Sequence, residues 1–280
     1  MRVETLAIIG VGLLGGSIAL AARRRRAAAR VVGVDASRAA LDHALGRALV
    51  DAVAGLPEAA AAADFVVVCT PVDCIASQIL AAAPACNPGC LLTDVGSTKA
   101  EIVRAVEGCL PPGVAYVGSH PLAGSEKHGP EHADAALFER RQVIVTPTPR
   151  TDPTSLDRVS SFWEALGATV RVMDPEEHDR ALALTSHLPH LVASALAAVL
   201  PPELAPLTAT GFRDTTRLAA SSPALWSAIL QANRAAVLEA LARYGERLAD
   251  FRAALEANDR AALEALLARG KQVKDSLADR

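Results

Sequence analysis

The stretch LAIIGVGLLGGS, residues 6–17, decides the fold of this chain. An apolar run typical of a buried strand ends at Ile9, and the G-x-G-x-x-G pattern after it opens an alanine-rich stretch with good helix propensity. In such a turn the first glycine permits a tight bend, the second lets backbone approach a pyrophosphate, and the third lets the helix pack on the strand. Free N–H groups at the helix start favour an anion. The pattern predicts a dinucleotide site formed by Gly10, Gly12, Leu13, Leu14 and Gly15.

A second strand-like run, residues 30–35, ends in Asp35, 20 residues after Gly15. A carboxylate at this place accepts hydrogen bonds from an adenosine ribose and repels a 2′-phosphate, which favours NAD over NADP. Arg38 is the discordant residue, because a guanidinium there could bind a 2′-phosphate instead. The structural alternative is a strand–helix turn in which Asp35 caps the next helix. We predict NAD as the cofactor, with NADP as the lesser alternative.

The composition narrows the class of protein. The chain has 280 residues, enough for two medium domains, and is 51% apolar but only 3% aromatic, so its core must be built from Ala, Leu and Val. A net charge of −3 gives no sign of a nucleic-acid partner. We find no uncharged apolar run of membrane-spanning length, and the first strand begins too early to leave room for a signal peptide. Five cysteines without C-x-x-C spacing suit a reducing compartment. We therefore expect a cytoplasmic protein that binds neither nucleic acid nor membrane.

The pattern changes near residue 174, which predicts two domains. Up to that point apolar runs that suit strands covered on both faces alternate with helical stretches, so residues 1–174 are predicted to form an α/β, doubly wound, mostly parallel sheet of the Rossmann type. The expected strands are 3–9, 30–35, 64–70, 90–95, 115–119, 141–147 and 168–173, and the expected helices are 15–26, 37–46, 73–83, 98–109 and 154–166. Residues 146–155 form a Pro/Thr-rich loop, and we expect the helix and strand after it to extend the same sheet.

Residues 175–280 show no convincing strand, and Leu and Ala recur there at helical spacing. This predicts an all-helical second domain. Long helices with broad Ala/Leu faces usually pack on a partner, so we predict a homodimer formed through this domain.

Three loops follow strands of the predicted sheet at the edge where ligands bind in such folds. The first contains Thr70 and Pro71, the second is DVGSTK from Asp94 to Lys99, and the third is GSHPLAGSEK from residue 118. We place Thr70, Pro71 and Asp94 at the cofactor, although Asp94 has the equal alternative of capping the next helix. Ser97 is better placed to face a ligand. His120 sits where a nicotinamide should lie.

The helical half adds further polar residues. His187 and His190 are three residues apart and could share a helix face. A His-x-x-His pair can suggest a metal, but no third ligand follows at an obvious spacing, so we expect no metal. In GFRDTTR at least one of Arg213 and Arg217 could clamp a carboxylate bidentately, and salt bridges between the domains are the structural alternative.

Six motifs in this order, GVGLLGGS, DVGSTK, GSHPLAGSEK, EEHD, SHLPH and GFRDTTR, resemble the prephenate dehydrogenase family, which includes arogenate and cyclohexadienyl dehydrogenases. The resemblance spans residues 6 to about 230, and Trp226 also fits it. It implies NAD-dependent oxidative decarboxylation of prephenate to 4-hydroxyphenylpyruvate in tyrosine biosynthesis. No fused chorismate mutase or regulatory domain is recognised, so feedback by tyrosine through such a domain is not expected.

The same resemblance implies roles for single residues. His120 hydrogen-bonds the C4 hydroxyl of the substrate and draws off its proton as hydride leaves, and Ser97 orients His120 and that hydroxyl. Arg217 binds a substrate carboxylate. The other implied pocket residues are His190 lining the pocket, His187 and His178 supporting it, Glu126 pairing with Arg217 at the entrance, and Asp214 near the substrate's side chain.

The choice of substrate stays open at this stage. A carboxylate at Asp214 favours the ammonium group of arogenate, whereas His190 and the arginines favour the more anionic prephenate. We favour prephenate, with arogenate or dual specificity as the alternative. A β-hydroxyacid dehydrogenase or imine reductase would commonly use a lysine in the helical half, and none lies between Lys127 and Lys271. A dinucleotide-binding scaffold would explain the glycines but not the polar loops.

Overall fold

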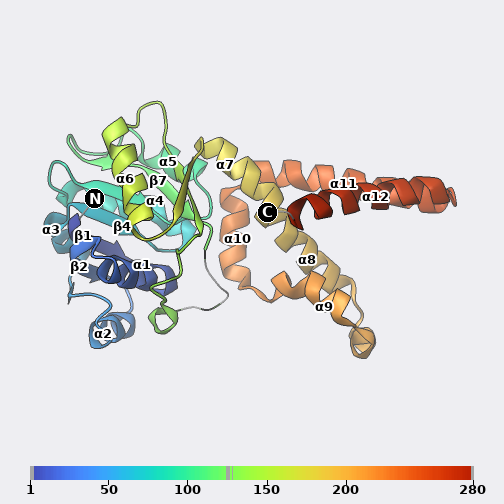
Figure 1. The fold of residues 1–280 in the computed structure, drawn as a ribbon, viewed down its shortest axis with the longest axis horizontal. Coiled ribbons are helices and arrows are strands. Elements are labelled where there is room, and N and C mark those ends of the chain that lie inside the picture. The colour runs from blue at the N-terminus through green and yellow to red at the C-terminus, as the bar shows by residue number, and fades with distance from the viewer. Residues whose placement is uncertain (1–2, 124–126, 128, 279–280) are drawn as a thin grey trace. The chain divides into compact units, whose positions relative to one another are not determined.

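The computed structural model describes residues 3–123, 127 and 129–278 (Figure 1). The chain forms two compact units, of which the first ends at Asn233 and the second begins at Arg234. Glu126, an expected pocket residue, lies outside the described residues.

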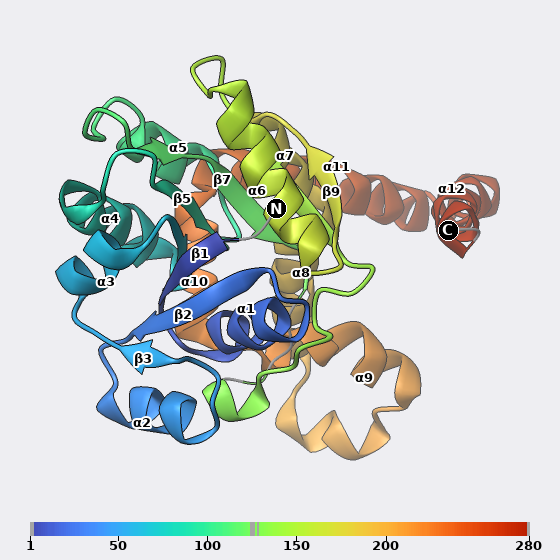
Figure 2. The same ribbon diagram turned by 60° about the vertical axis from the view of Figure 1, so that its left-hand side comes forward.

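The centre of the first unit is a parallel six-stranded sheet with strand order β3-β2-β1-β4-β5-β6 (Figure 2). Its strands are β1 (Val3–Ile9), β2 (Ala28–Val34), β3 (Ala52–Val53), β4 (Phe65–Val68), β5 (Leu91–Asp94) and β6 (Ala115–Tyr116). The predicted doubly wound fold is confirmed. The strand order reverses between β1 and β4, so the loops after these two strands face the crevice where such folds bind ligands.

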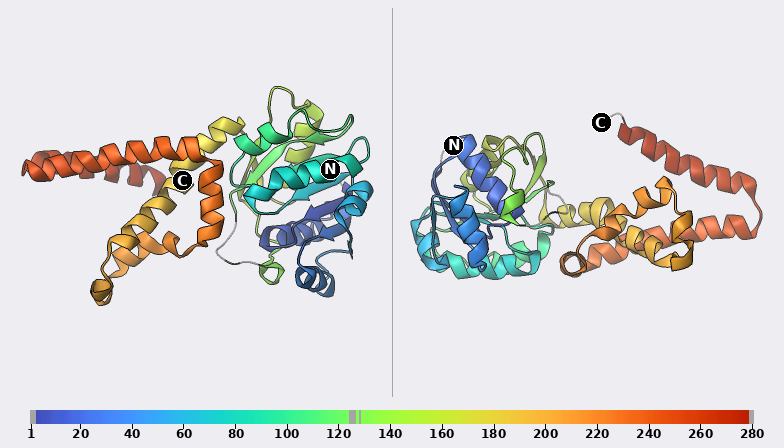
Figure 3. Two further views of the ribbon diagram at one scale, coloured as in Figure 1. Left: turned by 180° about the vertical axis from the view of Figure 1, so that it is seen from behind. Right: turned by 90° about the horizontal axis from the view of Figure 1, so that it is seen from below.

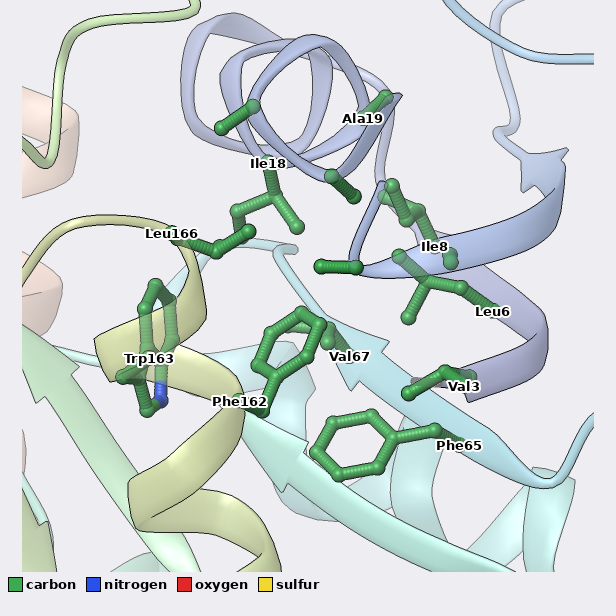
Figure 4. Close-up of a cluster of buried hydrophobic side chains, with 14 of the residues drawn as sticks. Val3, Leu6, Ile8, Ile18, Ala19, Phe65, Val67, Phe162, Trp163 and Leu166 are labelled. Carbon is green, nitrogen blue, oxygen red and sulfur yellow. The ribbon is translucent and has the colours of Figure 1, made fainter. Parts of the chain in front are cut away.

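Helices cover both faces of this sheet. On one face α1 (Leu13–Arg24) and α6 (Pro153–Ala165) pack on a core that includes Ile18, Phe65, Phe162 and Trp163 (Figure 4). The rings of Phe65 and Phe162 stack with centroids 4.6 Å apart. The opposite face is covered by α3 (Leu56–Ala62), α4 (Val72–Ala82) and α5 (Ala100–Val106), and α2 (Arg38–Gly46) follows β2.

A second, three-stranded sheet overturns one expectation. Strands β7 (Gly118–Pro121), β8 (Gln142–Thr146) and β9 (Thr169–Val172) form a sheet of their own, in which β7 runs antiparallel to β8. The predicted extension of the large sheet by the last strand was therefore wrong. The change of sheet occurs after Val117. The backbone N–H of Val117 still bonds Leu92 O of β5, but from Gly118 on the chain pairs with β8 instead.

Among the described residues after β9, every regular element is a helix, as expected. The first unit continues with α7 (Pro175–Leu182), a π-helical turn (Ala183–His187), α8 (Leu188–Val199), α9 (Thr210–Thr216) and α10 (Pro223–Ala232). The second unit consists of α11 (Arg234–Glu256) and α12 (Arg260–Ala278), which contact each other at the turn that joins them and diverge away from it (Figure 3). Helix α7 starts where it does because Asp174 caps it, accepting hydrogen bonds from Glu176 N and Glu177 N, with Pro175 in the first turn.

One helical stretch corrects the expectation about membrane-length runs. Pro175–Val199 is long and apolar enough, by length and composition alone, to cross a membrane. This stretch also carries His178 and His187, both buried and hydrogen-bonded inside the first unit. Buried polar side chains with partners are typical of a helix packed within a folded domain.

Candidate active site

The glycine loop, residues 10–15, joins β1 to α1 and is shaped by close backbone contacts. Gly10 has φ +96°, and a Cβ there would lie 2.8 Å from the backbone of Cys69. A Cβ on Gly15 would lie 2.0 Å from Gly10 O, so this position holds the helix against the strand end. Gly12 differs, because a Cβ on it would meet nothing within 4 Å. The loop therefore leaves open space beside Gly12, at the start of α1.

Asp35 at the end of β2 fixes this loop. Its Oδ2 accepts a hydrogen bond from Val11 N at 2.8 Å, and its Oδ1 accepts one from Ser37 N at 2.8 Å. The carboxylate thus lies beside the glycine loop, as a ribose-binding acid would. Arg38 is directed elsewhere: its Nε donates to Asp42 Oδ1 at 2.9 Å, and its side chain is 79% exposed.

The loop after β4 completes the cofactor edge. Thr70 Oγ1 is buried and has no hydrogen-bond partner among the described residues. Pro71 precedes the first turn of α4. An orphaned buried hydroxyl, an open space beside Gly12 and a helix N-terminus are the features that a dinucleotide would satisfy, so the residues present fit NAD.

Asp94 settles one open alternative. Its carboxylate is fully buried, forms an ion pair with Lys99, and accepts hydrogen bonds from Tyr116 OH at 2.9 Å and Ser119 N at 3.1 Å. The next helix, α5, is not capped by Asp94, because its first N–H groups bond Asp179 instead. The capping alternative is therefore not what the structure shows: Asp94 holds the DVGSTK loop against β7, and its place at the cofactor stays a prediction.

His120 lies on β7 with a buried side chain. Its Nδ1 is 2.9 Å from His178 Nε2 on α7, and the two rings meet edge to face with centroids 5.1 Å apart. Burial lowers the pKa of His120 well below its usual value, and the nearby His178, Lys99 and His187 lower it further. The ring is therefore neutral near pH 7.

A buried polar network, here called the histidine network, surrounds His120; its other members are Lys99, His178, Asp179, His187 and Asn233. His178 Nδ1 is 2.7 Å from Asp179 Oδ1, and the two Asp179 oxygens accept hydrogen bonds from Lys99 N at 2.8 Å and Ala100 N at 2.9 Å. Asn233 Nδ2 bonds Asp179 O at 2.7 Å and lies 3.1 Å from His187 Nδ1. The network therefore joins the DVGSTK loop to α7 and to the end of α10.

His190 and Trp226 form a second ring cluster with His187. The rings of His190 and Trp226 stack with centroids 3.3 Å apart, and the ring of His187 meets Trp226 edge to face at 6.1 Å. The two histidines thus share a helix face, as the spacing suggested. Burial lowers the pKa of His190, and the nearby Arg217 lowers it further. This places a guanidinium near the histidine cluster.

Comparisons with known proteins agree with this arrangement. Residues 18–172 match the nucleotide-binding domain of prephenate dehydrogenases, and residues 174–269 match their dimerization domain. The chain belongs to the prephenate dehydrogenase family.

Individual members of the family are similar along most of the chain. A cyclohexadienyl dehydrogenase of Zymomonas mobilis is 35% identical over 89% of this chain and 87% of its own length. A prephenate dehydrogenase of Bacillus subtilis is 36% identical over 84% of this chain, which spans 66% of that protein. The crystal structure of the Aquifex aeolicus prephenate dehydrogenase with hydroxyphenyl propionate and NAD+ has a TM-score of 0.90 at 31% identity, covering 100% of this chain and 99% of that one.

The other residues expected in the substrate pocket differ in burial and in their partners. Ser97 is half-buried, and among the described residues the partner of the His120 ring is His178 rather than Ser97. Arg213, Asp214 and Arg217 are exposed, and within the described part of the chain none of the three forms an ion pair. The ion pair that does join the two predicted domains there is made by Arg104 and Glu176. No group of three or more His, Cys, Asp or Glu side chains suited to a metal occurs within residues 3–123, 127 and 129–278. That the protein takes no metal stays a prediction.

Sequence reasoning missed three members of the network. Asp179 and Lys99 stand inside the quoted motifs EEHD and DVGSTK, but neither was given a role. The charge of each residue was the signal that could have identified them. A lysine or aspartate next to predicted site residues is expected to be buried, and a buried charge needs an opposite charge or a hydrogen-bond partner. Asn233 carried no signal in the sequence.

Proposed function

We propose that this chain is a prephenate dehydrogenase, which catalyses the NAD-dependent oxidative decarboxylation of prephenate to 4-hydroxyphenylpyruvate in tyrosine biosynthesis. The observation that carries the proposal is a neutral, buried His120, held by His178, on a chain that matches both domains of the family. Bound NAD+ supplies the acceptor for the hydride from C4 of the substrate.

His120 accepts one proton in this reaction and later returns it. Its Nε2 accepts the proton of the C4 hydroxyl as hydride leaves, which turns that carbon into a carbonyl. Loss of the ring carboxylate as CO2 then makes the ring aromatic and leaves a phenolate oxygen, which takes the proton back from Nε2. Prephenate and NAD+ thus give 4-hydroxyphenylpyruvate, CO2 and NADH without net uptake of a proton.

The remaining pocket residues position the substrate. Arg217 binds one of its carboxylates, and the stacked His190 and Trp226, supported by His187, form a wall of the pocket. Ser97 orients the hydroxyl. Glu126 is proposed to pair with Arg217 at the entrance.

Cofactor binding is assigned to the β1–α1 and β4–α4 loops. Gly10, Gly12, Gly15 and the backbone of Leu13 and Leu14 receive the pyrophosphate, Asp35 the ribose, and Thr70 and Pro71 the nicotinamide half. Asp94 supports this edge indirectly, from its buried ion pair. Arg38, already paired with Asp42, is left as a minor contributor.

Arogenate is the alternative substrate. Asp214 is exposed on α9. It is proposed to lie near the side chain of the bound substrate, where a carboxylate suits the ammonium group of arogenate. The similar cyclohexadienyl dehydrogenase of Zymomonas mobilis supports keeping dual specificity as the second candidate.

The assembly is proposed to be a cytoplasmic homodimer of two-domain chains, with the domains at 1–174 and 175–280. Large apolar side chains are exposed on the helical half, among them Val199 at 76% and Leu207 at 78%, and a partner copy would cover such residues. All five cysteines are free, which suits a reducing cytosol. Binding to nucleic acid or membrane is not expected.

A direct assay tests the function. Purified protein with NAD+ and prephenate should form NADH with release of CO2, and the same assay with arogenate measures specificity. The His120→Asn variant should lose about 10²- to 10⁴-fold in kcat while NAD+ affinity stays within about twofold. An unchanged kcat in that variant would remove His120 from the mechanism, and no NADH with either substrate would refute the proposed function.

A further inference from the structure

Asp179, His178 and His120 form a chain of two consecutive hydrogen bonds, with all three side chains buried. Asp179 Oδ1 is 2.7 Å from His178 Nδ1, and His178 Nε2 is 2.9 Å from His120 Nδ1. These two hydrogen bonds use only the Nδ1 atom of His120. Its other ring nitrogen, Nε2, is therefore the atom that can meet a substrate.

The direction of each bond follows from what each group can donate. Both Asp179 oxygens already accept backbone N–H groups, from Lys99 and Ala100, as a carboxylate does. A carboxylate only accepts, so the proton between Asp179 and His178 sits on His178 Nδ1. A neutral imidazole carries one N–H, which leaves His178 Nε2 as an acceptor and makes His120 Nδ1 the donor.

We propose that Asp179 and His178 are positioning residues that hold His120 as its Nδ1–H tautomer, with a bare Nε2 turned to the substrate hydroxyl. The proposal rests on the proposed function, because it assigns a purpose to His120 as a base. It deepens that function by naming the groups that make the base competent and that share its positive charge once the proton arrives.

The surrounding charges favour the same state. The groups that act on His120 are His178, Lys99 and His187, and together with burial they lower its pKa. His178 in turn is acted on by Asp179, Lys99 and Asp94; burial lowers its pKa, while the hydrogen bond to Asp179 opposes that shift. Both rings are therefore neutral near pH 7, which is the condition for a fixed tautomer. When His120 accepts a proton, the Asp179 charge lies two hydrogen bonds away and stabilises the cation.

Asp179→Asn is the decisive variant. Asp179 Oδ1 faces both Lys99 N and His178 Nδ1, and Oδ2 faces Ala100 N, so an amide turned either way sets its NH2 group against at least one N–H donor. In both orientations the negative charge that stabilises a protonated His120 is lost, and where the NH2 faces His178 Nδ1 the N–H order of both rings is also reversed. We expect kcat to fall about 10³-fold or more, as in catalytic triads with the same change, while KM for prephenate and NAD+ stays within about threefold.

The matched control is Asp174→Asn. The Asp174 carboxylate also accepts two backbone N–H groups, at the start of α7, but the hydrogen bonds found for it among the described residues include none to a histidine ring; only its backbone carbonyl bonds His178 N. It should lose stability to a similar degree and keep kcat within about twofold. Equal kcat losses in Asp174→Asn and Asp179→Asn would reduce Asp179 to a helix cap and overturn the proposal.

Two further measurements keep the proposal testable if Asp179→Asn does not fold. His178→Gln keeps an oxygen acceptor for His120 Nδ1 and should retain more kcat than His178→Leu, which has none. Nitrogen-15 NMR of the ring nitrogens in the wild-type protein at pH 7 should show His120 protonated at Nδ1 and bare at Nε2. The reverse tautomer would overturn the proposal. The NMR measurement needs no turnover of substrate. It therefore separates failure of the proposed positioning by Asp179 and His178 from failure of the proposed function.

Discussion

The glycine loop and the histidine network are built on opposite physical principles. The loop, residues 10–15, is contiguous and works by leaving side chains out, so that backbone packs at Gly10 and Gly15 and space opens at Gly12. The network gathers charged and polar side chains from β7, α7, the π-helical turn, the residue after α10 and the loop before α5 into the interior. The first site depends on shape, and the second on the pairing of every buried group.

This difference predicts how each region fails. A buried polar group costs little when its partners are present and a great deal when one is removed. A shape-based site has no such penalty, and a small side chain placed in its open space changes binding and leaves folding almost untouched. The three predictions below exploit this contrast.

The largest effect is expected at the buried ion pair. Lys99 is fully buried, pairs with Asp94, and donates to Ser119 O at 2.9 Å. Lys99→Met leaves the Asp94 charge without its cation, so the free energy of unfolding should fall by about 3–5 kcal/mol. Urea denaturation followed by circular dichroism measures it.

The control for this variant is a surface pair with the same residue types. Lys271 and Asp275 form an ion pair with side chains 75% and 60% exposed, so Lys271→Met should change stability by less than about 1 kcal/mol. If the two lysine variants lose equal stability, the contrast between buried pairing and surface charge is wrong for this protein.

A smaller loss is expected on acidification, through His187. Burial lowers the pKa of His187 to about 4, with Asp179 opposing the shift and His178 and His190 adding to it. In the unfolded chain its pKa is about 6.5, so between these values the unfolded state binds a proton that the native state does not. The contribution is therefore complete above about pH 6.5 and lost as pH falls to about 4, on the order of 3 kcal/mol.

The measurement is the urea midpoint between pH 7 and pH 4, compared with His187→Gln. Carboxylates also titrate in the lower part of this window, so the difference between the two curves isolates the histidine. Parallel curves for wild type and His187→Gln across the window would show that His187 does not carry this pH dependence.

Much of the fold was predictable from the sequence because its signals are local. The strands of the large sheet are apolar throughout, so runs such as DFVVVCT revealed β4 directly. β3 has only two residues, and α3 is a seven-residue helix that reads LPEAAAA, so neither has a pattern that periodicity can detect. The small sheet was misplaced because strand pairing is not local: β7 joins β8 across the intervening residues 122–141.

The same distinction holds for the site. The position of His120 after a strand of an α/β domain pointed to the crevice, and the structure places the ring in a buried polar network. Its partners were hidden because they are distant in the chain; Lys99 N and Asp179 are 80 residues apart. Sequence motifs mark where polar residues concentrate, but which donor meets which acceptor is decided by packing between segments.

The smallest effect on folding, and the sharpest test of the loop, is expected from Gly12→Ala. A Cβ at this position meets no atom of the protein within 4 Å, so stability should stay within about 0.5 kcal/mol of wild type. A methyl group there occupies the space proposed for the pyrophosphate, and the Kd for NAD+ should rise about tenfold, about 1.4 kcal/mol, in a calorimetric titration. Gly46→Ala, also in open space but at the end of α2, should bind NAD+ like wild type. Wild-type affinity in Gly12→Ala would mean that the cofactor does not approach this backbone, and the shape-based account of the loop would have to be abandoned.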